Sequence, residues 1–295
     1  MNERDAKKIL KEMFKKILEY QKQGIMPDNK FNNDFYSIVQ KECDQGDSES
    51  ENMYNLHSYF IENSIEKSIS ALESVKKEGI TINLLYEEII KIEYIIFLLN
   101  KLFTYLDRFF TNGKSKNTLN QKSFYLYKNN FFMPLKKDIS NALTSYFKEI
   151  DKIDNEENER KIRKIFQFMN TDRIFNPTIV KKNKEIKWEN EESENPPKNI
   201  NITVDSFDDW FHVHFLPDIN SLFESKVKEV KNLPIKEYIS SILNFKYQPI
   251  ILKNYFDNNY YNKILFIFNE NFIKGNKDKI EEFFFNLNRN DLKKY

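Results

Sequence analysis

The chain has 295 residues, of which 27 are phenylalanine, 16 are tyrosine and 5 are glycine. So few glycines argue against phosphate-cradling loops, dinucleotide-binding turns and tight-turned all-β folds, because these structures need the backbone freedom of glycine. With 46 basic and 45 acidic residues, the net charge of +1 provides no general attraction to nucleic acid. The single cysteine, Cys43, cannot form an intrachain disulfide and gives no indication of an oxidising compartment.

The N-terminal residues carry charges from Glu3 onward and lack the apolar core of a signal peptide. The longest apolar stretch, residues 89–110, is interrupted by charged and amide side chains, among them Lys91, Glu93 and Arg108. Charges at this density argue against a transmembrane helix. We therefore predict a protein of the cytoplasm, the nucleus or both, which binds neither membranes nor nucleic acid.

In chain order, apolar residues recur at helical spacing in six segments of the first half. The predicted helices span residues 3–23, 31–43, 52–77, 82–111, 123–150 and 156–169. The acidic, serine-rich stretch 44–52 is predicted to be a loop, and Gly79 is predicted to end the third helix. Pro134 is predicted to break or kink the fifth helix, because proline lacks an amide donor and its ring clashes with the preceding turn.

Residues 171–204 combine prolines, lysines and acidic residues with few apolar side chains, which predicts a linker or flexible insertion. Helices are then predicted from Asp205 to Tyr295, with breaks at Pro217, Pro234, Pro249 and Gly275. The predicted fold class is all-α, an elongated rod of stacked helical bundles. One bundle is assigned to residues 1–152 and the other, with the insertion, to residues 153–295.

Two stretches resemble the N-terminal region of cullins, the scaffold subunits of a class of ubiquitin ligases. The first contains Tyr105-Leu106-Asp107-Arg108, then Tyr125-Leu126 and a phenylalanine at 131 or 132. The second, residues 207–242, is similar to a cullin segment that runs from an acidic-aromatic start to a Glu-Tyr-Ile helix start. The end of the chain, Asp291, Leu292 and Tyr295, resembles a further element of the family.

The resemblance implies a cullin-repeat fold and a non-catalytic role as the N-terminal arm of a cullin-RING-type E3 ubiquitin ligase. In that arm the second and fifth helices of the first repeat dock a BTB/POZ-fold or Skp-like adaptor. The implied adaptor-binding residues are Phe31, Phe35, Tyr36, Val39, Phe124 and Tyr125. Exposed aromatic side chains on a rigid helix bury a large area at low entropic cost, which suits such an interface. The same helical spacing equally suits core positions.

Four features differ from the cullin pattern. Ile89 stands where cullins often have a tryptophan, and residues 245–249 replace an acid-rich helix. The insertion at 171–204 is longer than the usual connection. The C-terminal region that recruits the RING subunit in cullins is missing, so a RING partner is expected only if the full-length protein carries that region.

Other chemistry has little support in the sequence. His212 and His214 are two residues apart, so on a helix they point to different faces and cannot share one metal ion. Asp107 and Arg108 are adjacent and do not face each other on a helix, which favours a buried or capping contact that fixes the helix end. Cys43 has no neighbour in sequence that would activate it. We therefore predict no enzymatic activity, no cofactor and no metal.

Two alternative functions remain open. The chain could be a helical-rod subunit of a tethering or anaphase-promoting type of complex, which binds no BTB-fold adaptor. It could instead be a peripheral membrane protein that uses its aromatic faces, although the balanced charge and the absence of a basic amphipathic helix argue against this. Capture of an adaptor distinguishes the cullin-like function from both alternatives.

Overall fold

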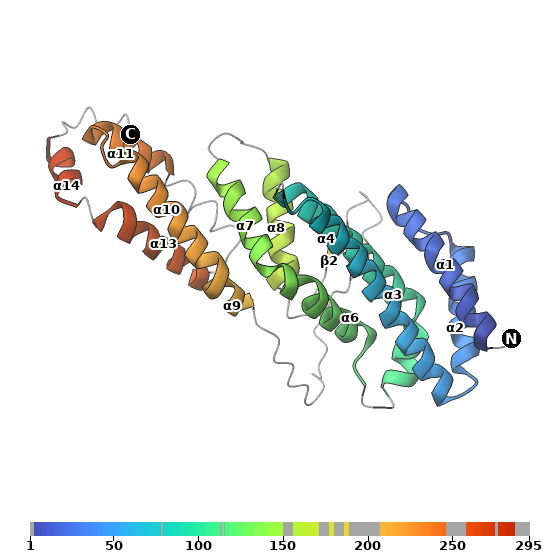
Figure 1. Cartoon of the computed structure of the whole chain (residues 1–295). Helices are drawn as coiled ribbons and strands as arrows, with labels where there is room; N and C mark the ends of the chain where they lie inside the picture. The colour runs from blue at the N-terminus through green and yellow to red at the C-terminus, as the bar shows by residue number, and fades with distance from the viewer. Residues whose placement is uncertain are drawn as a thin grey trace. The chain divides into compact units, whose positions relative to one another are not determined.

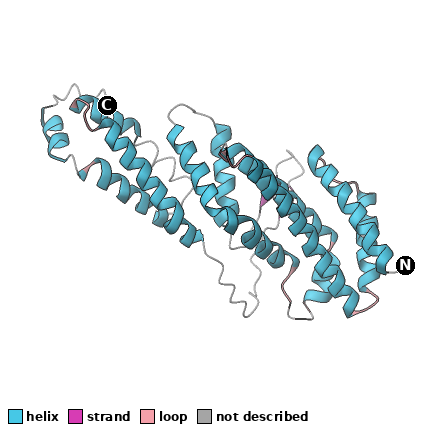
Figure 2. Cartoon of the chain, in the orientation of Figure 1, coloured by secondary structure: helices cyan, strands magenta, loops and turns pink. Residues whose placement is uncertain are grey.

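The computed structural model describes residues 3–77, 79–112, 114, 116–149, 156–170, 177–179, 186–188, 207–245, 258–274 and 277–286. Nearly all of these residues are helical, which confirms the predicted all-α fold class (Figures 1 and 2). Their contacts divide the chain into two compact units. The first unit comprises Met1–Gly79, Leu84–Leu135 and Phe168–Val204, and the second comprises Ile80–Asn83, Lys136–Gln167 and Asp205–Tyr295.

The first unit is built on amphipathic helices that share one aromatic core. Its elements are α1 (Glu3–Gln23), α2 (Asn29–Cys43), α3 (Asp47–Ser74), most of α4 (Ile82–Leu102), α5 (Thr104–Leu106), the π-helical turn η1 (Asp107–Thr111), α6 (Leu119–Tyr127) and the π-helical turn η2 (Lys128–Phe132). Phe14 of α1 stacks on Phe60 of α3 with ring centroids 4.3 Å apart. Phe103, between α4 and α5, meets both Phe60 and Phe35 of α2 edge-on.

The stretch 44–52, predicted to be a loop, is mostly helical, and that prediction is wrong. Helix α3 begins at Asp47, so only the residues between Cys43 and Asp47 connect it to α2. Two features favour this early start. Asp47 and Glu49 stand in the first helical turn, where the helix dipole attracts negative charge. Gly46 makes the connection with φ at 149°, a conformation that other residues rarely adopt.

Two prolines that were predicted to interrupt helices are instead preceded by π-helical turns. Met133 donates its amide to the Lys128 carbonyl, and Pro134 follows directly. Leu216 likewise donates to Phe211, and Pro217 follows. A proline ring normally clashes with a carbonyl group of the preceding helical turn. The extra residue in each π-helical turn shifts that carbonyl group away from the ring, so the helix continues. The predicted break at Pro217 is therefore wrong, and at Pro134 the helix is not broken, so that only the alternative of a kink stays a prediction. Pro234 directly precedes α11 as expected.

The second unit forms around a buried tryptophan. Its helices are most of α7 (Met133–Glu149) and α8 (Glu156–Asn170), then α9 (Phe207–Trp210), the π-helical turn η4 (Phe211–Phe215), α10 (Leu216–Val230), α11 (Ile235–Phe245), α13 (Asn258–Phe272) and α14 (Lys277–Asn286). The Trp210 indole stacks on Phe215 at 5.2 Å and donates its N–H to the Lys136 carbonyl at 2.9 Å. This hydrogen bond satisfies the one polar atom of a side chain that is otherwise in the core.

Within residues 171–204 the structure describes two strands of three residues each, β1 (Pro177–Ile179) and β2 (Ile186–Trp188), which pair antiparallel. The remainder of the predicted linker lies outside the described residues, as do Pro249 and the motif at 291–295. The compact units do not divide at residue 152, because 136–149 group with the second unit. The repeat boundary at 152 stays a prediction. Among the helices described, none combines the length and apolarity that crossing a bilayer requires.

Candidate functional site

The six residues that the resemblance assigns to adaptor binding differ in accessibility. Phe35 and Val39 of α2 are fully buried, at 0% exposure. Phe35 packs between the half-buried Phe31 and the core residue Phe103, with ring centroids 6.4 and 5.3 Å away. A docking role for Phe35 and Val39 is therefore incompatible with their burial, and the core alternative applies to both.

The half-buried side chains of α2 lie on either side of this buried stripe. Phe31 meets Tyr20 of α1 edge-on, with ring centroids 5.6 Å apart. Tyr36 turns toward α5, where its ring meets Tyr105 edge-on at 6.2 Å. Of the α2 residues proposed for docking, Phe31 and Tyr36 therefore each join another aromatic side chain outside the core, Phe31 toward α1 and Tyr36 toward α5.

The remaining two predicted residues are on α6. Tyr125 is 43% exposed. Phe124 is half-buried, and the Lys128 ammonium lies 5.2 Å from the centre of its ring. Helix α6 packs against α3 and continues into η2, whereas α2 packs against α1, α3 and α5. The two groups of predicted residues thus come from helices that both contact α3.

A partly exposed aromatic cluster forms from residues of α2, α5 and η1, and we define it as the half-buried Tyr36 and Tyr105 together with the exposed Phe109. The rings of Tyr105 and Phe109 lie 4.5 Å apart, and Phe109 is 66% exposed. The Tyr105 hydroxyl donates a hydrogen bond to the Asp44 carboxylate, and this bond raises the pKa of Tyr105 to about 12. The phenol therefore stays neutral at any physiological pH.

Sequence reasoning did not identify Phe109, which lies next to the buried Phe110 in a segment predicted only as an amphipathic helix. Tyr105 and Phe109 are one helical turn apart, and this spacing was the available signal. The π-helical turn η1 begins between them, at Asp107. Such turns occur frequently at functional sites, because the extra residue redirects the side chains around it.

Asp107 makes a capping contact, as predicted, but at the start of α6 and not at the end of its own helix. Its carboxylate accepts a hydrogen bond of 2.8 Å from the Leu119 amide, the first residue of α6. The adjoining Thr118 and Gln121 form a reciprocal capping box for the same helix. Burial raises the pKa of Asp107, because the charged form loses hydration. Arg108 is exposed, so the two adjacent residues do not act as a pair.

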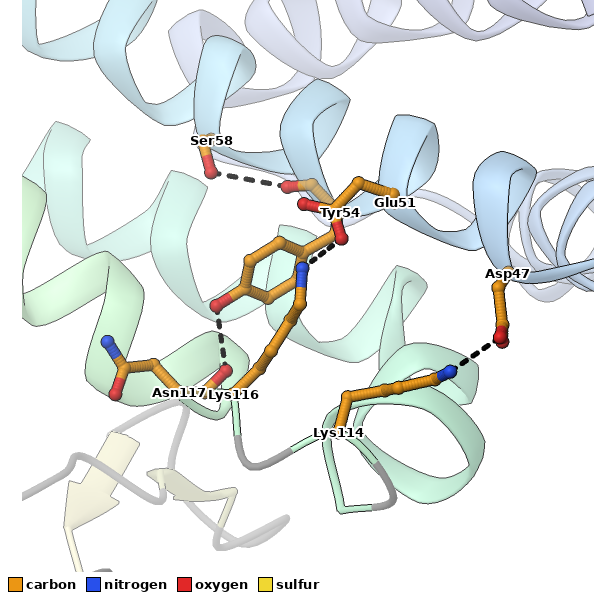
Figure 3. A network of polar contacts seen from close by, with 7 residues as sticks. All are labelled: Asp47, Glu51, Tyr54, Ser58, Lys114, Lys116 and Asn117. Atoms are coloured by element: carbon orange, nitrogen blue, oxygen red, sulfur yellow. Dashed lines mark hydrogen bonds and ion pairs between the residues drawn. The ribbon is translucent and has the colours of Figure 1, made fainter.

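Two lysines connect the segment before α6 to the beginning of α3 (Figure 3). Lys114 and Lys116 form ion pairs with Asp47 and Glu51, and the Tyr54 hydroxyl donates to the Asn117 carbonyl at 2.8 Å. The ion pairs are at least partly exposed and each contributes little by itself. Together with the Asp107 cap, these contacts hold the connection between η1 and α6 against α3.

A buried polar network joins α3, α4 and α6 beneath this surface. The His57 ring nitrogen Nε2 lies 2.8 Å from Oδ1 of Asn100, and that oxygen also accepts from the Ser123 hydroxyl at 3.0 Å. Asn100 donates in turn to Asn120. Burial lowers the pKa of His57 to about 3, so the ring is neutral and donates through Nε2.

Glu42 is fully buried on α2, and neither carboxylate oxygen has a hydrogen-bond partner in the part of the chain that the structure describes. A buried polar group without a partner costs free energy. We therefore expect Glu42→Met, which keeps the side chain's length, to raise the free energy of unfolding by about 1–3 kcal/mol. Urea denaturation followed by circular dichroism measures the change, and a less stable variant would contradict the expectation.

The remaining candidates for chemistry have structural partners. In the second unit, the ring nitrogen Nε2 of His212 is 2.7 Å from the Lys263 ammonium nitrogen. No group of three metal-binding side chains occurs among the described residues. Cys43 is buried, and burial raises the pKa of its thiol to about 11, which keeps the thiol protonated and a poor nucleophile.

No protein-family model matches this chain, and no curated protein matches it in sequence.

Proposed function

We propose that this chain is the adaptor-binding arm of a cullin-RING-type ubiquitin ligase, and that its aromatic cluster docks a BTB/POZ-fold or Skp-like adaptor. The aromatic cluster, with Phe109 exposed and the two tyrosines half-buried, is the observation that carries the proposal. In this cluster Tyr36 of α2, the helix that the resemblance assigns to docking, contacts Tyr105. Tyr105 is the first residue of the Tyr-Leu-Asp-Arg motif on which the resemblance rests, and its ring also contacts Phe109. The elongated rod of cullin-repeat bundles is part of the same proposal.

The chemistry of the cluster suits a protein partner. Phe109 offers an exposed apolar surface, and Tyr36 and Tyr105 add rings that each carry a hydroxyl group. Tyrosine and other aromatic side chains dominate the binding energy of many protein interfaces. The role of such an arm would be positional: a scaffold that holds a substrate receptor near the catalytic machinery accelerates transfer by proximity, without chemistry of its own.

We expect Phe109→Lys to weaken adaptor binding at least about thirtyfold, which corresponds to about 2 kcal/mol for the loss of a central aromatic contact. The control is Phe266→Lys in the second unit, because Phe266 is 64% exposed and Phe109 is 66% exposed. Both variants should retain the wild-type circular dichroism spectrum. Affinity capture from extract of the native cell identifies the adaptor, and titration of the purified pair gives the two affinities.

Tyr125→Lys tests whether α6 contributes to the same interface. A loss of affinity similar to that of Phe109→Lys would extend the docking surface to α6, and unchanged affinity would confine it to the aromatic cluster. Recovery of other helical-rod subunits without an adaptor would instead favour membership of a different complex. Retention of the chain on liposomes would favour the peripheral membrane alternative.

A further inference from the structure

Lys122, near the start of α6, lies against an aromatic ring instead of an acceptor. Its ammonium nitrogen is 3.6 Å from the centre of the Tyr54 ring of α3. The side chain is half-buried, and within the described residues it has no hydrogen-bond or ion-pair partner. An amine in this position has lost part of its hydration without gaining an acceptor.

A second ammonium group approaches the same ring. Lys116 lies with its nitrogen 5.5 Å from the centre of the Tyr54 ring and is itself held by Glu51. Figure 3 shows Lys116 reaching across from the connection before α6 to α3. A lysine that is desolvated and close to another cation is the arrangement that activates an amine as a nucleophile.

The charges around Lys122 act in both directions. Burial is the largest effect and Lys116 adds to it, and both favour the neutral amine; Glu51 and Glu62 favour the ammonium form. The face of the Tyr54 ring also attracts the cation. The neighbouring ionisable groups on α3 contribute no further charge, because His57 is neutral and burial raises the pKa of Tyr54 to about 12. The balance lowers the pKa of Lys122 from 10.5 to about 8.

From this arrangement we propose that Lys122 is a site of covalent acyl modification, and that it reacts with small acyl thioesters faster than the other lysines of the chain. In this step the neutral amine nitrogen attacks the thioester carbonyl carbon. The N–C bond forms, the C–S bond breaks, the thiolate leaves, and the displaced amine proton goes to solvent. No oxidant or reductant is needed. The proposal does not depend on adaptor binding.

Acylation would also change the structure locally. The amide product carries no charge, so the cation–π contact with Tyr54 is lost and Lys116 no longer faces a second cation. Lys116 belongs to the segment between η1 and α6. This segment directly follows η1, which contains Phe109 of the aromatic cluster. Acylation of Lys122 would therefore change the electrostatic environment of a segment that adjoins the proposed docking surface in the sequence.

The test is the rate at which acetyl-coenzyme A acetylates each lysine of the full chain, measured by peptide mass spectrometry over a range of pH. The neutral amine is far more abundant at Lys122 than at an ordinary lysine near neutral pH, and its weaker nucleophilicity offsets part of this gain. We therefore expect Lys122 to react roughly tenfold faster than the exposed Lys67. Its rate should be half-maximal near pH 8.

The variant Lys116→Gln removes the second cation and releases Glu51, so the reaction of Lys122 near neutral pH should slow severalfold. Lys114→Gln is the matched control, because Lys114 is paired with Asp47 and is not among the groups acting on Lys122. Thermal melting checks that both variants remain folded. The proposal is overturned if Lys122 reacts no faster than Lys67. A fast reaction that Lys116→Gln leaves unchanged would overturn the part assigned to Lys116.

Discussion

Replacing Phe35 by alanine is expected to lower the free energy of unfolding by about 3–5 kcal/mol, because the fully buried ring leaves a cavity that its neighbours cannot fill. Phe35 packs against Phe31 and Phe103 and so links α2 to the core. Urea denaturation, followed by circular dichroism, measures the change. An effect of this size is a large fraction of the stability of a typical domain.

Phe109→Ala provides the matched comparison for Phe35→Ala. The same atoms are removed, but Phe109 is 66% exposed, so its loss should change the free energy of unfolding by no more than about 0.5 kcal/mol. The pair separates two roles that the sequence could not distinguish. If Phe35→Ala left stability unchanged, Phe35 would not be a core residue, and a docking role for it would become possible again.

Acid is expected to destabilise the first unit through His57. The imidazole is neutral in the folded protein, where burial lowers its pKa from 6.5 to about 3. Below pH 6.5 the unfolded chain binds a proton that the folded chain excludes. The free energy of unfolding should therefore fall by about 1.4 kcal/mol per pH unit, and by about 4–5 kcal/mol in total as the pH approaches 3.

The variant His57→Gln keeps a hydrogen-bond donor for Asn100 but cannot titrate, so it should remove this dependence on pH. His212→Gln, in the second unit, is the control and should retain it. The change in the free energy of unfolding with pH is best measured between about pH 6.5 and about pH 5. At lower pH, Asp107 acts in the opposite direction, because burial raises its pKa and the folded state then binds the proton more readily. An unchanged slope in His57→Gln would assign the effect to another group.

The two experiments on stability also bear on the proposed docking surface. Asn100, the partner of His57, is connected through Asn120 and Ser123 to the start of α6, and Asp107 caps the same helix. Because His57 stays neutral in the folded protein until the pH approaches 3, this network is intact between about pH 6.5 and about pH 5. Adaptor binding through the aromatic cluster should therefore not depend on His57 over that range of pH, as long as the chain is folded.

The sequence by itself determined the helices and indicated one capping contact. Apolar residues at helical spacing set the amphipathic segments, since each needs a partner that covers its apolar stripe. Asp107 was expected to make a buried or capping contact because adjacent residues on a helix do not face each other, and the structure shows a capping contact with Leu119. The helical stripes depend on residues close in sequence, which is why local patterns predicted them. The partner of Asp107 comes from the next helix, and the sequence did not predict it.

The accessible surface was decided by tertiary structure. Phe35 and Tyr36 are adjacent aromatics on α2, and packing against Phe103 buries the first and leaves the second at the edge of the core. Phe109 and Phe110 are likewise adjacent, and the π-helical turn around them sets which one is exposed. Periodicity gives the angle between two neighbouring side chains but not the direction of the helix that covers them. That direction follows from long-range packing, so the candidate docking surface became visible only in the folded chain.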